Sequence, residues 1–264
     1  MTTVPTPSHV LLHRFLDPEN RIILSKGDFS DFLEAYHTHV EVWGEVKDGL
    51  SQTFMRQGLA AGVIHLSNAP RDLSYGLTIH LSHPPTNVFI TGDSLESSVT
   101  GRVYVEGVKD LGSSRLYMQS QRPKQEPSLS VLEIEGLDLL DIFERYYLES
   151  EQRPIRLFDL ENGEFIQVAS LPGADPEFFP ALTREAGAAL FENDAIQLLE
   201  SRPFFFQCGC NPQRMLTALR RMFADDPEEI FQGDPKIETS CPRCGRRWWI
   251  SREEFETPGT SEHD

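Results

Sequence analysis

Four cysteines in two close pairs constrain the fold of this chain more than any other feature. One residue separates Cys208 from Cys210, two separate Cys241 from Cys244, and thirty lie between the pairs. Zinc prefers four thiolate ligands at about 2.3 Å, supplied by two short chain segments. The spacing therefore predicts one tetrahedral zinc site with all four cysteines as ligands.

Such a site can be structural or redox-sensitive. Cys241 and Cys244 alone favour a structural zinc ribbon, because most sites built from such pairs are structural. The spacing of Cys208 and Cys210 favours redox sensitivity, since a disulfide between them closes a small strained ring and strained disulfides are the labile kind. Metal-bound thiolates are also the form of cysteine that oxidants attack. We therefore expect a site that can change its redox state.

The composition indicates an acidic protein with enough apolar residues for a packed core. The chain has 264 residues, 39% of them hydrophobic, and a net charge of −17. Because such a surface repels phosphate backbones, we expect no nucleic-acid partner. The N-terminal sequence has no apolar run typical of a signal peptide, and no run of about 18 apolar residues occurs. We expect a cytoplasmic location and no membrane association.

Apolar periodicity predicts the α+β class: an N-terminal mixed sheet domain with helices, a helical linker and a small C-terminal zinc-binding domain. Polar, Gly- and Pro-rich turns separate short β-prone runs, as in an antiparallel sheet. The predicted strands are 21–25, 77–81, 87–90, 102–105, 115–118, 128–134, 155–158 and 165–168. The predicted helices begin near Asp28 or Ser30 and at 43 and 137, the last two ending at 65 and 149.

These elements divide the chain into four predicted segments. The α+β core domain covers 1–172, the helical linker 173–202, the zinc-binding redox-switch domain 203–256 and a tail 257–264. The linker is expected to contain helical pieces at 181–191 and 195–201. It has few large apolar side chains, so we expect it to bury little surface and to be marginally stable.

Within the zinc domain, Asn211 can cap a helix that has Pro212 in its first turn. A strand is expected at 203–207, and a strand pair at 236–240 and 246–250 around the second cysteine pair. Trp248 and Trp249 are expected to pack this domain against its helix.

Several motifs resemble the 33 kDa heat-shock chaperonin family, the redox-regulated holdase chaperones. Cys-x-Cys, about thirty residues and Cys-x-x-Cys near the C-terminus is that family's pattern, and the flanking segments 204–210 and 237–245 are similar as well. The segment 146–158 also resembles the family, as do 100–107 and 13–16. The likeness spans most of the chain.

The resemblance implies an ATP-independent molecular chaperone rather than an enzyme. One zinc per chain holds the C-terminal domain folded in the reduced state. Oxidation forms the disulfides Cys208–Cys210 and Cys241–Cys244 and releases the metal. The zinc domain and then the linker unfold, unfolding client proteins are bound, and the oxidised chain forms a homodimer.

Two alternatives stay open. A constitutive zinc-ribbon module could bind a partner protein without redox switching. A disulfide-exchange enzyme could use Cys241 and Cys244, although this needs a βαβ context that the expected strand pair does not provide. No Gly-rich phosphate loop or Gly-x-Ser-x-Gly motif indicates other catalysis. His37 and His39 lack a third ligand at suitable spacing, so we interpret them as surface or packing residues.

Overall fold

The structure is a computed structural model that describes residues 8–43 and 48–257. Contacts divide the chain into two compact units, Met1–Gln207 and Cys208–Asp264. The sequence placed the start of the zinc domain at 203, after a linker over 173–202. No helix in the described ranges is both long and apolar enough to cross a membrane.

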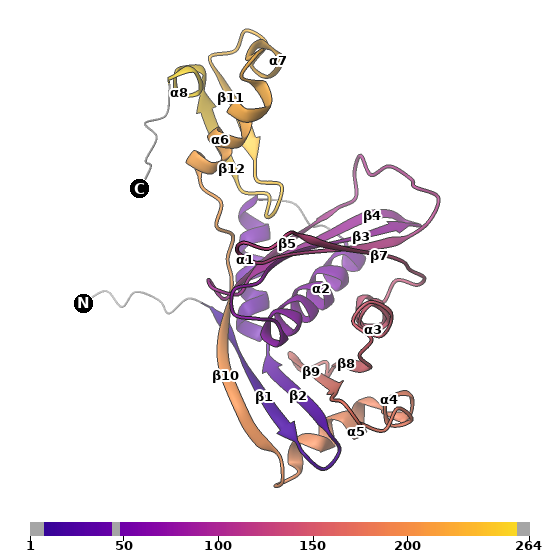
Figure 1. The fold of residues 1–264 in the computed structure, drawn as a ribbon. Coiled ribbons are helices and arrows are strands. Elements are labelled where there is room, and N and C mark those ends of the chain that lie inside the picture. The colour runs from indigo at the N-terminus through magenta and orange to yellow at the C-terminus, as the bar shows by residue number, and fades with distance from the viewer. Residues whose placement is uncertain (1–7, 44–47, 258–264) are drawn as a thin grey trace, which may run out of the picture. The chain divides into compact units, whose positions relative to one another are not determined.

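One ten-stranded sheet forms the framework of the N-terminal unit (Figure 1), in the order β7-β6-β3-β4-β5-β10-β1-β2-β9-β8. Neighbouring strands are antiparallel except β5 and β10, which pair in parallel at Ser98–Phe205 and Val99–Phe206. The mixed sheet and its helices confirm the α+β class. The strands are β1 His9–Asp17, β2 Ile22–Asp28, β3 Ser74–Ser82, β4 Pro85–Asp93, β5 Ser98–Tyr104, β6 Arg115–Gln121, β7 Ser128–Glu133, β8 Ile155–Asp159, β9 Glu164–Ser170 and β10 Gln197–Phe206.

Three longer helices accompany this sheet: α1 Ser30–Trp43, α2 Gly49–Asn68 and α3 Leu139–Glu149. Asp48 caps α2 by accepting a 2.7 Å hydrogen bond from the Ser51 amide. The helix packs on β4 and β5, and a Cβ at Gly62 would lie 2.9 Å from Ile90. Only glycine permits this close approach of helix and sheet.

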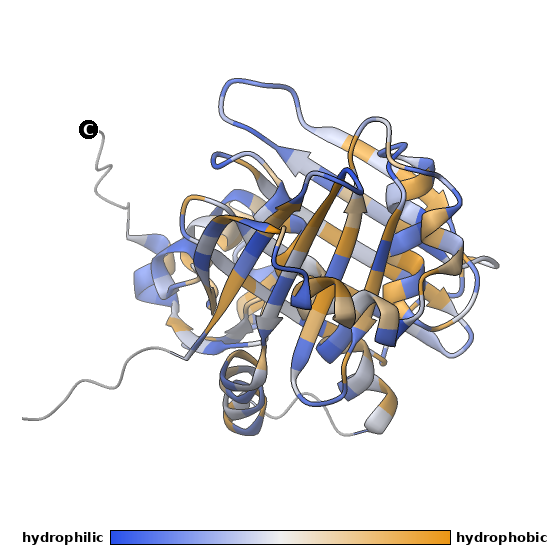
Figure 2. Ribbon diagram, turned by 90° about the horizontal axis from the view of Figure 1, so that it is seen from below, coloured by the Kyte–Doolittle hydropathy of each residue, from blue (hydrophilic) through white to orange (hydrophobic). Residues whose placement is uncertain are grey.

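Hydrophobic residues recur along the strands between polar ones, as the hydropathy colouring shows (Figure 2). The main core lies on the face of the sheet that packs against the long helices, and its largest fully buried side chains include Phe29, Phe32, Phe54 and Phe143. Alternation along the strands directs successive side chains to opposite faces. The predicted strand pattern is thereby confirmed between residues 74 and 170.

The short helices α4 Phe178–Ala181 and α5 Arg184–Ala189 belong to a second hydrophobic cluster. Phe179 and Leu182 are buried there against Ile22, Leu24, Phe158, Ile166 and Val168 of the sheet. The expectation that this segment buries little apolar surface is wrong. The segment has few apolar residues, but those it has pack against apolar side chains of the sheet.

The helix expected at 195–201 is also wrong, because strand β10 begins at Gln197 within this range. This strand pairs with β1 from Leu16–Gln197 to His9–Phe205. The strand expected at 203–207 is confirmed as the C-terminal part of β10. Pairing with the distant strand β1 outweighs local helix propensity in this segment. The sequence pattern did not predict β1.

The C-terminal unit contains α6 Pro212–Phe223, α7 Glu228–Phe231, α8 Arg252–Glu256 and the antiparallel pair β11 Lys236–Ser240 and β12 Arg247–Ser251. The predicted cap is confirmed, since the Asn211 side chain accepts a 2.8 Å hydrogen bond from the Arg214 amide. The core of this unit is small. Its buried members are Leu216, Phe231, Ile250 and Phe255.

Candidate metal centre

Two short segments of the C-terminal unit position the four cysteines. Cys208 and Cys210 lie just before α6, and Cys241 and Cys244 lie in the turn that joins β11 to β12. The first pair is half-buried, whereas Cys241 and Cys244 are 2% and 3% exposed. The helix and the hairpin thus bring together residues that the sequence separates by thirty positions.

The four Sγ atoms all lie within 4.8 Å of one another. The Sγ atoms of Cys208 and Cys241 are 3.8 Å apart, and those of Cys210 and Cys244 are 3.5 Å apart. Thiolates at about 2.3 Å from a tetrahedral zinc ion are separated by about 3.8 Å. The donor set and its spacing therefore fit one metal ion of this kind.

Backbone hydrogen bonds form the turn around Cys241. The Cys241 amide donates to the Arg246 carbonyl over 2.8 Å, and the Gly245 amide donates to the Cys241 carbonyl over 2.9 Å. The Arg243 amide points at the Cys241 sulfur from 3.4 Å. Gly245 has a φ of 78°, a conformation that side chains other than glycine rarely adopt. Amides directed at a sulfur stabilise its thiolate form.

Hydrogen bonds among the thiols shift their pKa values in opposite directions. The pKa of Cys241 is lowered, because the Cys208 and Cys244 thiols donate to its sulfur. The pKa of Cys208 is raised to about 12, chiefly through its hydrogen bond with Cys241. The pKa of Cys244 is also raised, through Cys208 and then Cys241. If all four thiols lose their protons, the thiolates at this spacing repel one another, so a bound cation is needed to hold them together.

Across residues 8–43 and 48–257, these four cysteines form the one group of three or more His, Cys, Asp or Glu side chains arranged to hold a metal ion. His37 is exposed on α1, and the His39 ring lies 5.5 Å from the Phe206 ring. Neither histidine belongs to a metal cluster. Their interpretation as surface and packing residues agrees with these positions.

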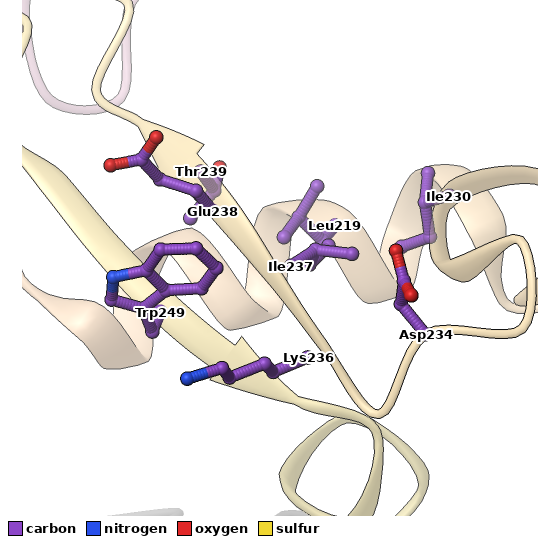
Figure 3. Close-up of a pocket in the computed structure, with 8 residues that line it drawn as sticks. All are labelled: Leu219, Ile230, Asp234, Lys236, Ile237, Glu238, Thr239 and Trp249. Carbon is purple, nitrogen blue, oxygen red and sulfur yellow. The ribbon is translucent and has the colours of Figure 1, made fainter.

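A surface pocket of about 420 Å³ lies elsewhere in the C-terminal unit (Figure 3). Trp249 lines it with 61% of its surface exposed, and the Lys236 ammonium lies 4.8 Å from its ring centroid. The expected packing role of Trp249 is wrong, whereas Trp248 is half-buried. Successive residues of a strand face opposite sides, so both tryptophans cannot pack against one helix. The lining residues are Leu219, Ile230, Asp234, Lys236, Ile237, Glu238, Thr239 and Trp249.

A family model described as Hsp33 protein matches residues 159–251, which include all four cysteines. The resemblance to the Hsp33 family is confirmed. The 33 kDa chaperonin of Nitrosococcus oceani is 24% identical over 166 residues, covering 55% of this chain and 57% of that protein. The 33 kDa chaperonin of Caldanaerobacter subterraneus subsp. tengcongensis is 22% identical over 181 residues, covering 58% of each. The chain therefore spans somewhat more than half the length of these Hsp33 relatives.

The fold is also similar to a solved Hsp33 structure. The crystal structure of the 33 kDa chaperonin from Thermotoga maritima matches with a TM-score of 0.69 over 94% of this chain and 97% of that chain. The sequence identity is 16%, so this likeness concerns the fold alone.

Proposed function

We propose that this chain is a member of the Hsp33 family and acts as a zinc-dependent, ATP-independent holdase chaperone that oxidation activates. The observation that carries the proposal is the cluster of four cysteine sulfurs within 4.8 Å. Cys208, Cys210, Cys241 and Cys244 are the proposed zinc ligands, one ion per chain. The proposed location is the cytoplasm, where thiols are kept reduced.

The small core of the C-terminal unit supports a switch. Only Leu216, Phe231, Ile250 and Phe255 form its buried hydrophobic cluster among the described residues. Units below about 70–80 residues rarely gain enough stability from such a core without a metal or disulfide. Zinc contributes about 10–16 kcal/mol of folding free energy in small metal-binding peptides at neutral pH. Loss of the metal is therefore expected to unfold this unit.

Oxidation removes the ligands in pairs. Each disulfide takes two thiolates and passes two electrons to the oxidant, for example a peroxide that is reduced to water. The proposed disulfides are Cys208–Cys210 and Cys241–Cys244. Disulfide sulfurs carry no negative charge, so they no longer bind the metal.

Unfolding of the C-terminal unit would expose its apolar core residues to solvent. Met222 and Trp249 are already 72% and 61% exposed, so the apolar surface of this unit would extend beyond its core. Large exposed apolar surfaces bind other proteins. The proposed partners are unfolding client proteins and, in the oxidised state, a second copy of this chain.

The test compares aggregation of a chemically unfolded client in the presence of three samples. These are the reduced zinc-loaded chain, the peroxide-oxidised chain, and oxidised chain that has been reduced again with zinc. Suppression is expected only with the oxidised sample. Equal suppression by all three would leave a chaperone without a redox switch, and suppression by none would reject the chaperone.

The exposed Trp249 favours one alternative, a constitutive zinc module that binds a partner protein. Its indole borders the pocket of Figure 3 and can be removed with little loss of packing. In that case W249A would abolish partner binding by the reduced chain, and oxidation would have no activating effect.

A further inference from the structure

Four arginines lie near one another in the N-terminal unit, and two of them pair with the same carboxylate, that of Glu200. Arg14 of β1 lies directly opposite Glu200 of β10, and its guanidinium is 3.7 Å from that carboxylate. Arg71, which follows α2, pairs with the same carboxylate. Arg202 lies two residues beyond Glu200 on the same face of β10. Arg153, which precedes β8, is close enough to Arg14 to lower its pKa.

Arg202 is buried, and serine oxygens hold its guanidinium. It is 7% exposed, and its guanidinium donates to the Ser97 and Ser94 hydroxyls over 3.0 to 3.2 Å and to the Ser94 carbonyl. It also lies 4.7 Å from the ring centroid of Phe204. These contacts fix the guanidinium in place, and within residues 8–43 and 48–257 it forms no salt bridge.

Arg153 is held in a similar way, because its Nε donates to the carbonyl oxygen of Ser170 over 2.9 Å. Among the described residues, Glu200 is the only carboxylate that forms an ion pair with any of the four arginines. Glu151, two residues before Arg153, accepts a 2.6 Å hydrogen bond from the Tyr146 hydroxyl and is a second carboxylate nearby, so two carboxylates accompany four guanidiniums. The cluster is therefore cationic, in a chain whose net charge is −17.

Two buried groups in the cluster have no hydrogen-bond partner within the described part of the chain. They are the Nε of Arg14 and the hydroxyl of Ser25, and these two residues lie directly opposite each other on β1 and β2. A buried donor without an acceptor costs about 1–3 kcal/mol. Two such groups at one cross-strand position indicate that an acceptor belongs between them.

The positive charge of the cluster and its exposure to solvent indicate what kind of acceptor it binds. Burial lowers the pKa of Arg14, and the guanidiniums of Arg153 and Arg71 lower it further, while Glu200 opposes them. An anion at this place would relieve the repulsion. The side chain of Arg71 is 65% exposed and that of Arg14 22%, so the cluster opens to solvent on the Arg71 side.

We propose that this cluster, the arginine site, binds a phosphate group. Guanidinium forks match the oxygens of phosphate in geometry, and a hydroxyl adds a further donor. The site lies in the N-terminal unit and is independent of the cysteine cluster and of the proposed chaperone activity. Its members are Arg14, Ser25, Arg71, Arg153, Arg202 and Glu200.

The test measures binding of inorganic phosphate to the reduced, zinc-loaded full chain by calorimetry, with chloride at matched ionic strength as reference. R71A removes an exposed arginine and should weaken binding about tenfold, the effect of losing one charge-assisted hydrogen bond. E200Q removes the competing carboxylate and should tighten binding. R184A is the matched control, because Arg184 is also exposed and pairs with one glutamate, Glu161, outside the site.

A second arm replaces inorganic phosphate with linear polyphosphate. If polyphosphate displaces inorganic phosphate and binds R71A more weakly than the unchanged chain, the ligand is a phosphate chain. Binding of inorganic phosphate alone would identify the free anion. If phosphate acts no differently from chloride, water fills the site and the proposal is rejected. Equal phosphate affinity in R71A and R184A would reject it as well.

Discussion

The Sγ atom of Cys210 lies 3.5 Å from that of Cys244, although 34 positions separate them in the chain. Because the two cysteine pairs share one site, metal binding by each pair depends on the other pair. In the C244S variant three thiolates remain and one coordination position is open. We expect zinc affinity to fall at least about tenfold, the loss that even outer-shell changes cause. Metal analysis during titration with a chelator measures this, and M222S, a change at an exposed residue of α6, should leave the affinity unchanged.

Oxidation should link neighbours in sequence rather than neighbours in space. The contacts of the reduced cluster join Cys208 to Cys241 and Cys210 to Cys244. If the unit unfolds as the metal leaves, these contacts are lost and the short loops within each pair close fastest. Peptide mapping without reduction should find Cys208–Cys210 and Cys241–Cys244. Dominant links between the two pairs would show that the folded unit survives metal loss.

Hydrogen exchange should rise from Cys208 onward after oxidation and stay low in β10. The backbone of β10 is bonded to β1 along its length and to β5 near its end, including the Phe205 amide to the Ser97 carbonyl at 2.9 Å. Amides that are bonded to these neighbouring strands open only with the surrounding sheet. Rapid exchange at 197–206 in the oxidised chain would instead show that unfolding continues into the N-terminal unit, as the predicted linker requires.

F231A should make the C-terminal unit easier to unfold. Phe231 is fully buried and contacts the Phe255 ring with centroids 5.5 Å apart. Removing a buried phenylalanine costs about 3–5 kcal/mol, a large share of what so small a core can supply. We expect faster zinc release to a chelator and activation at lower peroxide. M222A, which alters an exposed side chain, is the control for the rate of zinc release, and identical release rates in F231A and M222A would contradict the proposed coupling of metal and core.

Acid should destabilise the N-terminal unit through His65. Burial lowers the pKa of His65 from 6.5 to about 4, and Glu151 only partly opposes this. The Tyr75, Tyr146 and Tyr147 rings surround it, and its Nδ1 lies 2.8 Å from the Tyr147 hydroxyl. Below pH 6.5 the unfolded chain takes up a proton that the folded chain refuses until about pH 4.

Stability of this unit should therefore fall as the pH decreases from 6.5 to 4, by about 3 kcal/mol in total from this group. Urea unfolding at each pH, with hydrogen exchange of the α2 amides as the readout, measures the free energy of unfolding. H65Q should flatten the dependence, whereas H37Q, at an exposed position of α1, should not. A pH dependence that is the same in H65Q as in the unchanged chain would exclude His65 as its source.

Short-range sequence signals predicted most of the elements. The strands predicted at 155–158 and 165–168 correspond to β8 and β9, and Asn211 with Pro212 indicated where α6 begins. The cysteine spacing predicted the cluster that the structure shows. These predictions succeed because caps, tight turns and metal-binding knuckles depend on residues a few positions apart.

The sequence alone therefore determined the α+β class, the hairpins and the set of four cysteines. Only the tertiary structure decided that residues 197–202 form a strand, that Phe179 is buried, and that Trp249 faces solvent. It alone placed Glu200 in one row with Arg14 and Ser25, because β10 is far in sequence from the consecutive strands β1 and β2. Pairing between distant strands outweighs local propensity, and no short window of sequence contains the partner.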